Sequence, residues 1–211
     1  MNTYPSDGIS PDTVVWIAVL APVLIALIWS GATYNRLVNL RNLIEGAWSN
    51  VDTELRRRYD LIPNLVDTVK AYAAHERAVI ESVTQARVNA MNATGSPEQQ
   101  AGFENELVHS LKSLFAVSEG YPELKASENF LALAHELVNT EDRIQAARRF
   151  FNGNVREYNT VVGCFPSCLI AGLCGFERKQ YFEIEDAVAR AVVSIQDELH
   201  RADGANGSQH P

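Results

Sequence analysis

Residues 56–65 read RRRYDLIPNL. This stretch decides the fold because apolar side chains at helical spacing lead into it and leave it again. Proline lacks a backbone donor and clashes with the carbonyl four residues earlier, so Pro63 is expected to end or kink the arriving helix. We therefore predict the tip of a helical hairpin with a basic rim, and a kinked continuous helix is the lesser alternative.

Four amphipathic segments are arranged around this stretch, the first before Pro63 and the others after it. The first carries Leu37, Leu40, Ile44, Ala47, Val51 and Leu55, and the second carries Val66, Val69, Ala73, Ile80, Val83 and Ala90. A third helix is expected to begin near Pro97, and a fourth to cover residues 127–160. No strand-like alternation competes, so residues 33–183 are predicted to form an antiparallel four-helix bundle.

Residues 14–29 read VVWIAVLAPVLIALIW and contain no polar side chain except the indole of tryptophan. A bilayer core needs roughly 20 helical residues, so a transmembrane helix is predicted over 13–32. A cleaved signal peptide is the alternative, but residues 1–12 lack the basic side chains it requires. Arg36 and Arg41 follow the span, which predicts residues 1–12 outside and the remainder cytoplasmic.

Residues 163–175 read GCFPSCLIAGLCG, an apolar segment too short to span a bilayer. If the bundle helices alternate in direction, the fourth returns this segment to the membrane surface. Its large apolar side chains, Phe165, Leu169, Ile170 and Leu173, are then expected to insert or dock there. An amphipathic helix over 184–201 and a disordered tail over 202–211 complete the prediction.

The composition excludes some classes of function. A net charge of −8 argues against nucleic-acid binding, which needs a positive surface. The odd, clustered set Cys164, Cys168 and Cys174 favours reduced thiols in a cytoplasmic domain. Glu106-x-x-His109 is a single copy of a motif that di-iron bundles use twice, so we predict no metal, cofactor or catalytic residue.

The basic run Arg56-Arg57-Arg58 could be a solvated helix face or a docking site. Attraction to anionic lipid fades within about 8 Å at physiological salt, and this run is expected about 30 Å from the bilayer. We therefore predict that Arg56, Arg57, Arg58 and Asn64 bind an unknown, acidic protein partner. A homo-oligomer is a further possibility for the partner.

The chain also resembles the LemA family. The resemblance rests on RRRYDLIPNLVDTVKAYAAHE at 56–76, AARRFFNGNVREYNT at 146–160, and shorter matches between residues 34 and 183. It implies a bacterial membrane protein with one N-terminal span, a cytoplasmic helical bundle and no established catalytic activity. A relative of this family is linked to magnetosome membrane formation, which suggests a role in membrane organisation.

These observations predict a non-enzymatic, single-pass protein of the bacterial cytoplasmic (inner) membrane. Its predicted function is that of a scaffold or adaptor that recruits a partner or organises the membrane. Two alternatives stay open from the sequence. One is a metal-dependent or other enzyme built on bundle carboxylates, and the other is a self-assembling protein that remodels the membrane.

Overall fold

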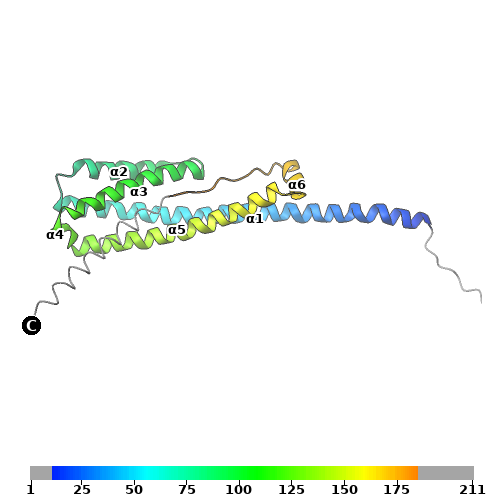
Figure 1. The fold of residues 1–211 in the computed structure, drawn as a ribbon, viewed down its shortest axis with the longest axis horizontal. Helices are drawn as coiled ribbons and strands as arrows, with labels where there is room; N and C mark the ends of the chain where they lie inside the picture. Colours follow the sequence, from blue (N-terminus) through cyan, green and yellow to red (C-terminus); the bar gives the residue numbers. More distant parts are fainter. Residues whose placement is uncertain (1–10, 185–211) are drawn as a thin grey trace, which may run out of the picture. The chain divides into compact units, whose positions relative to one another are not determined.

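The computed structural model describes residues 11–184. Regular structure within this range is entirely helical, which confirms the all-α prediction with a long apolar N-terminal helix; the antiparallel four-helix bundle stays a prediction. The predicted helix over 184–201, apart from its first residue, lies outside the described range, as do the predicted tail over 202–211 and residues 1–10. The helices are α1 (Pro11–Tyr72), α2 (Arg77–Asn92), α3 (Pro97–Glu119), α4 (Pro122–Lys125), α5 (Glu128–Gly163) and α6 (Ser167–Leu173) (Figure 1).

The described residues divide into two compact units. Unit 1 contains residues 11–43 and 157–178, and therefore the apolar part of α1, the end of α5, and α6. Unit 2 contains residues 44–156 and 179–184, with the rest of α1 and α5 and all of α2, α3 and α4.

The predicted hairpin break at Pro63 is wrong, because α1 continues through Pro63 to Tyr72. A proline at this position leaves the carbonyl of Tyr59, four residues earlier, without its usual helical donor. Arg87 of α2 supplies a replacement, since its Nε donates a hydrogen bond to the Tyr59 carbonyl at 2.7 Å. The turn lies later in the chain, where the amide of Glu76 donates to the carbonyl of Ala73 at 3.1 Å.

Local sequence explains how α3 begins. Ser96 is the N-cap, its hydroxyl accepts from the amide of Gln99 at 3.4 Å, and the Gln99 side chain accepts from the Ser96 amide at 3.1 Å. This reciprocal capping box satisfies two donors that a helix start otherwise leaves open. Pro97 occupies the first turn, where its missing N–H has no helical partner to lose.

Segments of α1, α2, α3 and α5 share the buried core of unit 2. Apolar side chains at helical spacing fill it, and the rings of Phe115 and Phe130 meet with centroids 5.9 Å apart. Deeply buried members include Val51, Leu55, Ile62, Val83, Leu107, Leu111, Leu114, Leu137 and Ile144. Burial of one such leucine or isoleucine contributes about 1.5–3 kcal/mol, so this pattern is the main source of stability.

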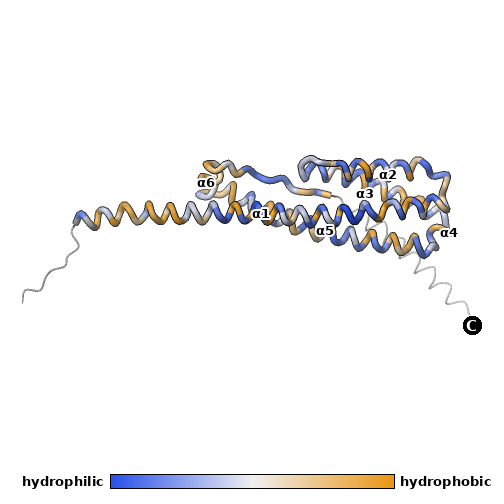
Figure 2. The backbone as a smooth tube through the Cα atoms, turned by 180° about the vertical axis from the view of Figure 1, so that it is seen from behind, coloured by the Kyte–Doolittle hydropathy of each residue, from blue (hydrophilic) through white to orange (hydrophobic). Residues whose placement is uncertain are grey.

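The first part of α1, in unit 1, has the opposite pattern. The side chains described between Val14 and Ile28 are apolar and exposed all round the helix. The hydropathy colouring of Figure 2 shows this part of α1 as mostly hydrophobic. A helix that is apolar on every face is stable only when something apolar surrounds it. The helix is long and apolar enough to cross a membrane.

Candidate functional site

In unit 1, α5 runs antiparallel to α1 and fixes the position of α6 (Figure 1). Arg36 Nη2 of α1 lies 3.1 Å from Glu157 Oε1 of α5. From Glu157, α5 continues for six residues to Gly163, a rise of about 9 Å towards the apolar part of α1. The end of α5 therefore lies level with Ser30, where the apolar stretch of α1 finishes.

Two sets of contacts hold α6 at this level. The Ser167 hydroxyl lies 2.6 Å from the carbonyl oxygen of Val161 and 2.9 Å from that of Cys164, which ties the start of α6 to the end of α5. The ring of Phe176, just after α6, contacts Tyr34 of α1 edge-on with centroids 5.7 Å apart. The short helix is thus attached to both neighbours.

The end of α6 depends on one glycine. The amide of Phe176 donates to the Ala171 carbonyl at 2.9 Å, and the amide of Gly175 to the Gly172 carbonyl at 3.4 Å. This pair of bonds is a Schellman motif, which needs a left-handed residue after the helix. Gly175 has a φ of 72° and supplies it, which turns the chain back so that Phe176 reaches Tyr34.

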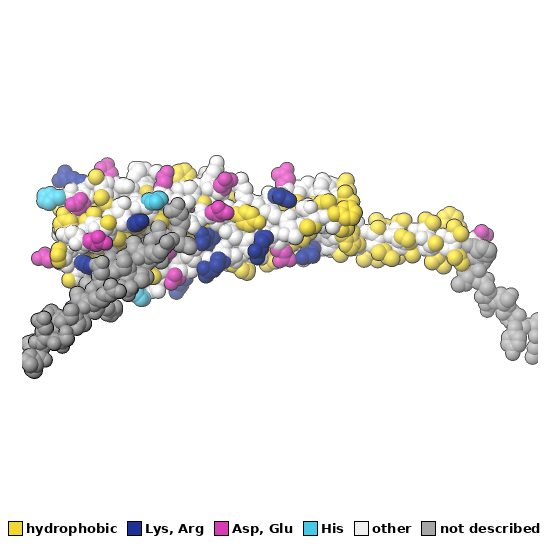
Figure 3. All heavy atoms as spheres, in the orientation of Figure 1, with side chains coloured by type: hydrophobic (Ala, Val, Ile, Leu, Met, Phe, Trp, Pro, Cys, Tyr) yellow, Lys and Arg dark blue, Asp and Glu magenta, His cyan; other side chains and the backbone are white. Residues whose placement is uncertain are grey.

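Large apolar side chains of this segment face outward. Phe165 is 81% exposed, Leu169 58% and Leu173 84%, and we call these three residues the α6 patch. Ile170, which the sequence also predicted to dock, is half-buried, while Ala171 faces inward and is buried. In Figure 3, hydrophobic side chains sheathe the start of α1 and also gather where the end of α5 and α6 meet it. That Phe165, Leu169, Ile170 and Leu173 meet the membrane surface stays a prediction, and the ring contact between Phe176 and Tyr34 was not anticipated from the sequence.

The three cysteines lie in the same region. Cys164 and Cys174 are exposed, Cys168 is half-buried, and all three thiols are free. Their main chains take part in placing α6, since the amide of Cys168 donates to the Cys164 carbonyl at 2.8 Å.

The predicted partner-binding residues in unit 2 do not share one environment. Arg58 has no exposed surface, so its assignment to a partner-binding tip is wrong. Arg56 and Arg57 are exposed, but Asp52 lies 2.8 Å from Arg56 and Glu136 lies 3.8 Å from Arg57. Because a carboxylate offsets each of these two charges, the expected basic rim has little excess positive charge. Asn64 is exposed on α1, 8 residues before its end at Tyr72.

Arg58 instead joins three helices in a buried ionic network. Its guanidinium donates to Glu104 of α3 and, at 2.8 Å, to Glu141 of α5, and both carboxylates are buried. The Tyr59 hydroxyl also donates to Glu104, and the Gln100 amide donates to the same carboxylate at 2.7 Å. Removal of one member of such a buried pair leaves an uncompensated charge, so the network fixes how α1, α3 and α5 pack.

The surroundings of the network favour the charged form of Arg58 and the neutral form of the Tyr59 phenol. Burial acts to lower the pKa of Arg58, but Glu141 and Glu104 outweigh it and raise the pKa. Burial raises the pKa of Tyr59 well above its ordinary value, and Glu104 raises it further. Because Arg58, Glu104 and Glu141 have essentially no exposed surface, no substrate reaches them in this conformation.

Sequence reasoning missed Glu104 and Glu141. A signal was present: both stand at core positions of apolar stripes, Glu104 between Ala101 and Leu107, and Glu141 between Leu137 and Ile144. Two carboxylates at core positions require a buried cation, because isolated charges are almost never buried. Arg58, on the inward face of α1, satisfies both at once with a planar, forked donor.

The single Glu106-x-x-His109 motif, which di-iron bundles use twice, lies on the surface. Glu106 and His109 are both exposed on α3 and line a shallow cavity of about 490 Å³ beside Ser82 and Gln85 of α2. Among residues 11–184, no group of three or more His, Cys, Asp or Glu side chains is arranged to hold a metal ion.

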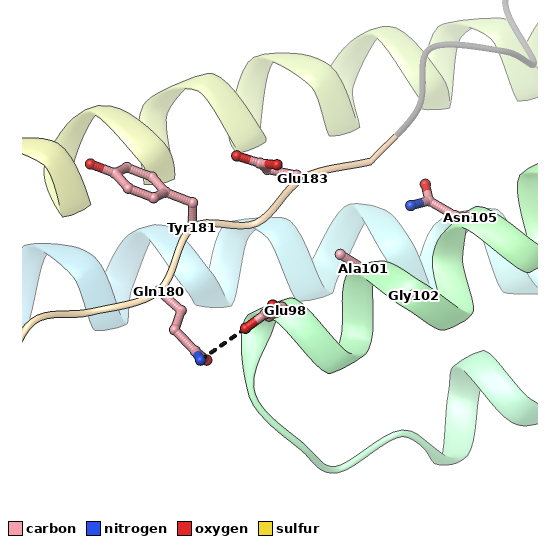
Figure 4. A pocket seen from close by; sticks show the side chains of 7 residues that line it. All are labelled: Glu98, Ala101, Gly102, Asn105, Gln180, Tyr181 and Glu183. Atoms are coloured by element: carbon pink, nitrogen blue, oxygen red, sulfur yellow. Dashed lines mark hydrogen bonds between the residues drawn. The ribbon is translucent and has the colours of Figure 1, made fainter.

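A second cavity in unit 2 lies beside an extended segment of chain. It has a volume of about 480 Å³ and is lined by Glu98, Asn105, Gln180, Tyr181 and Glu183, among others (Figure 4). Gln180 closes one side of it by donating to Glu98 at 3.0 Å.

The segment is anchored next to that cavity by Phe182, which is fully buried. The amide side chain of Asn152 binds both the N–H and the carbonyl of Phe182 at 2.9 Å. The Phe182 ring meets the indole of Trp48 edge-on with centroids 5.2 Å apart. The cavity is therefore bordered by a strand-like segment that α1 and α5 hold in place.

An apolar, exposed N-terminal helix, together with the all-helical regular structure of residues 11–184, defines a membrane-associated all-α protein. The profile of the LemA family matches residues 47–196, so the chain belongs to the LemA family. LemA family and MamQ proteins are not known enzymes.

Named relatives agree with this assignment. Magnetosome protein MamQ of Magnetospirillum gryphiswaldense is 24% identical over 188 residues, covering 77% of this chain and 69% of that protein. Magnetosome protein MamQ 2 of Paramagnetospirillum magneticum gives the same identity and coverage. Protein LemA of Metamycoplasma hominis is 25% identical over 137 residues, covering 65% of this chain and 63% of that protein.

Proposed function

We propose that this protein is a non-enzymatic scaffold of the bacterial cytoplasmic membrane, anchored by α1 and docked on the bilayer by the α6 patch. Residues 1–12 lie outside, and the helical domain lies in the cytoplasm. In this proposal the helices of unit 2 recruit a protein partner to the membrane.

The observation that carries the proposal is the place of the α6 patch in unit 1. Three large apolar side chains are exposed in the segment that follows the end of α5, and that end lies level with the end of the apolar part of α1. In water this exposure has no compensation, whereas at a membrane surface each side chain gains about 1.5–3 kcal/mol by leaving water. A short amphipathic element beside a membrane helix is suited to lie in the interface.

Partner recruitment rests on the rest of the molecule. The buried ionic network is enclosed and makes the packing of unit 2 specific, which is what a rigid binding surface needs. The relatives named as magnetosome proteins support a role at membranes. The partner-facing residues in this proposal are Arg56, Arg57 and Asn64, which are exposed on α1; Arg58 is not among them.

Site-specific photo-cross-linking in native membranes tests the scaffold function. A photoreactive amino acid at Arg57 or Asn64 is expected to give the same discrete adduct, and the same residue at buried Val51 is expected to give none. A reporter fused at the C-terminus is expected to be active only in the cytoplasm. Absence of adducts from both exposed positions contradicts partner recruitment, and a reporter outside the cytoplasm contradicts the orientation.

A further inference from the structure

We infer that Arg178 forms, with the C-terminal end of α5, a binding site for the phosphate of an anionic membrane lipid. The inference rests on the proposed docking of the α6 patch and adds a lipid class to it. The sequence predicts basic binding residues only at positions 56–58, and Arg178 is not among them.

Gly163 fixes the position of the Arg178 guanidinium. A Cβ added to Gly163 would lie 2.6 Å from Arg178 Nη2, so the guanidinium rests directly against the backbone at the end of α5. Carbonyl groups at a helix C-terminus carry partial negative charge and attract a cation. A guanidinium has five N–H donors, so one edge can face the helix end while the other binds a phosphate.

The height of Arg178 matches that of lipid headgroups. Gly163 is about 9 Å beyond the Arg36–Glu157 pair, level with Ser30 at the end of the apolar part of α1. The Arg178 side chain is exposed there, beside the α6 patch. Headgroup phosphate is the anion that a membrane supplies at the edge of its apolar core.

Local charge also favours an anionic surface. Residues 33–43 and 157–178 together contain three arginines and two glutamates, a net charge of +1, although the whole chain carries −8. Arg36 and Arg41 lie on α1, where Arg36 is paired with Glu157, and Arg178 lies against the helix end next to the patch. A basic side chain near an anionic leaflet contributes about 1 kcal/mol.

The test uses the full chain in nanodiscs with a spin label on Cys174, in a background where Cys164 and Cys168 are serine. The measured quantity is the ratio of bilayer-embedded to water-exposed label. We expect this ratio to be higher in phosphatidylglycerol-containing discs than in pure phosphatidylcholine discs. Arg178→Gln should lower it about fivefold in the anionic discs, corresponding to about 1 kcal/mol.

Three variants sharpen the result. Arg178→Lys should recover part of the ratio, and Gly163→Ala, which displaces the guanidinium, should lower it. Arg56→Gln makes the same change of charge in unit 2 and should leave the ratio unchanged. Inorganic phosphate added to phosphatidylcholine discs should have no effect; a rise in the ratio would show that free phosphate, rather than lipid, is the ligand and would overturn the inference.

Failures of the two proposals are distinguishable. A label that stays water-exposed in both lipids contradicts membrane docking of the α6 patch, and with it the lipid site. A label embedded equally in both lipids, and unaffected by Arg178→Gln, overturns the lipid site alone and leaves docking in place.

Discussion

Arg87 Nε of α2 donates a 2.7 Å hydrogen bond to the main-chain carbonyl of Tyr59 in α1. Pro63 has no N–H to donate to this carbonyl. The Arg87 side chain, from a neighbouring helix, takes the place of the missing helical donor. The bond explains why α1 continues where the sequence favours a break.

The repair makes Arg87 and Pro63 energetically coupled. Arg87→Leu should destabilise unit 2 by about 1–3 kcal/mol, because the part-buried Tyr59 carbonyl loses its donor. In a Pro63→Ala background the amide of residue 63 can take that carbonyl, and the same substitution should have a smaller effect. Urea unfolding of the four proteins measures the coupling. Equal effects of Arg87→Leu in both backgrounds would show that the bond contributes nothing to the helix through Pro63.

Arg58 should behave unlike its two neighbours. Arg58→Met leaves Glu104 and Glu141 buried without their cation, and we expect a loss of about 3–5 kcal/mol. Arg56→Gln is the matched control, since Arg56 is exposed, and should change stability by no more than about 0.5 kcal/mol. Thermal unfolding in detergent compares them. Similar unfolding temperatures for the two variants are incompatible with the buried network described above.

Tyr59 should make stability depend on alkaline pH. Burial and Glu104 raise the pKa of the Tyr59 phenol above its ordinary 10.0, so the folded protein retains a proton that the unfolded chain loses. This stabilisation is complete below about pH 10 and is lost as the pH rises towards the folded pKa, by up to about 1.4 kcal/mol per pH unit.

Tyr59→Phe removes that titration. The variant should be less stable than the parent at neutral pH by about 1–3 kcal/mol, because Glu104 and Gln100 lose a buried partner. The difference should shrink above pH 10. Denaturant unfolding at several pH values provides the comparison, and a difference independent of pH would refute the assigned role of the phenol.

Phe182 should anchor the extended segment in unit 2. Phe182→Ala removes a fully buried ring and should destabilise the protein by about 3–5 kcal/mol or release the segment. Tyr181→Ala alters an exposed neighbour and serves as the control. Hydrogen exchange at residues 180–184 is the readout: protection should fall in the first variant and persist in the second.

Periodicity was sufficient to predict the helical class and much of the core. Leu37, Val51 and Leu55 are buried as their spacing indicated, and α3 begins at Pro97 as expected. The break at Pro63 could not be judged from local sequence, because the group that rescues the helix is Arg87, 24 residues further along the chain. Local propensity was overridden here by a tertiary contact.

The α6 patch and the basic run illustrate the same distinction. Phe165, Leu169 and Leu173 lie in a short apolar run, and their exposure depends on how the chain folds after α5, which the local sequence does not reveal. The arginines at 56–58 look equivalent in sequence. Consecutive residues of a helix are rotated by about 100° around its axis, so one of the three points inward while two face solvent. Which of them is buried depends on Glu104 and Glu141, and those partners are distant in sequence.

Solvent access to Cys174 tests the central claim, that the α6 patch lies on the bilayer. The full chain, with serine at positions 164 and 168, is treated with a membrane-impermeant maleimide in inside-out native membrane vesicles. A matched protein carries its single cysteine at Glu123, an exposed position on α4. We predict slow labelling of Cys174 and rapid labelling at position 123, with equal rates once detergent dissolves the membrane. Equally rapid labelling of both positions before detergent would contradict the claim.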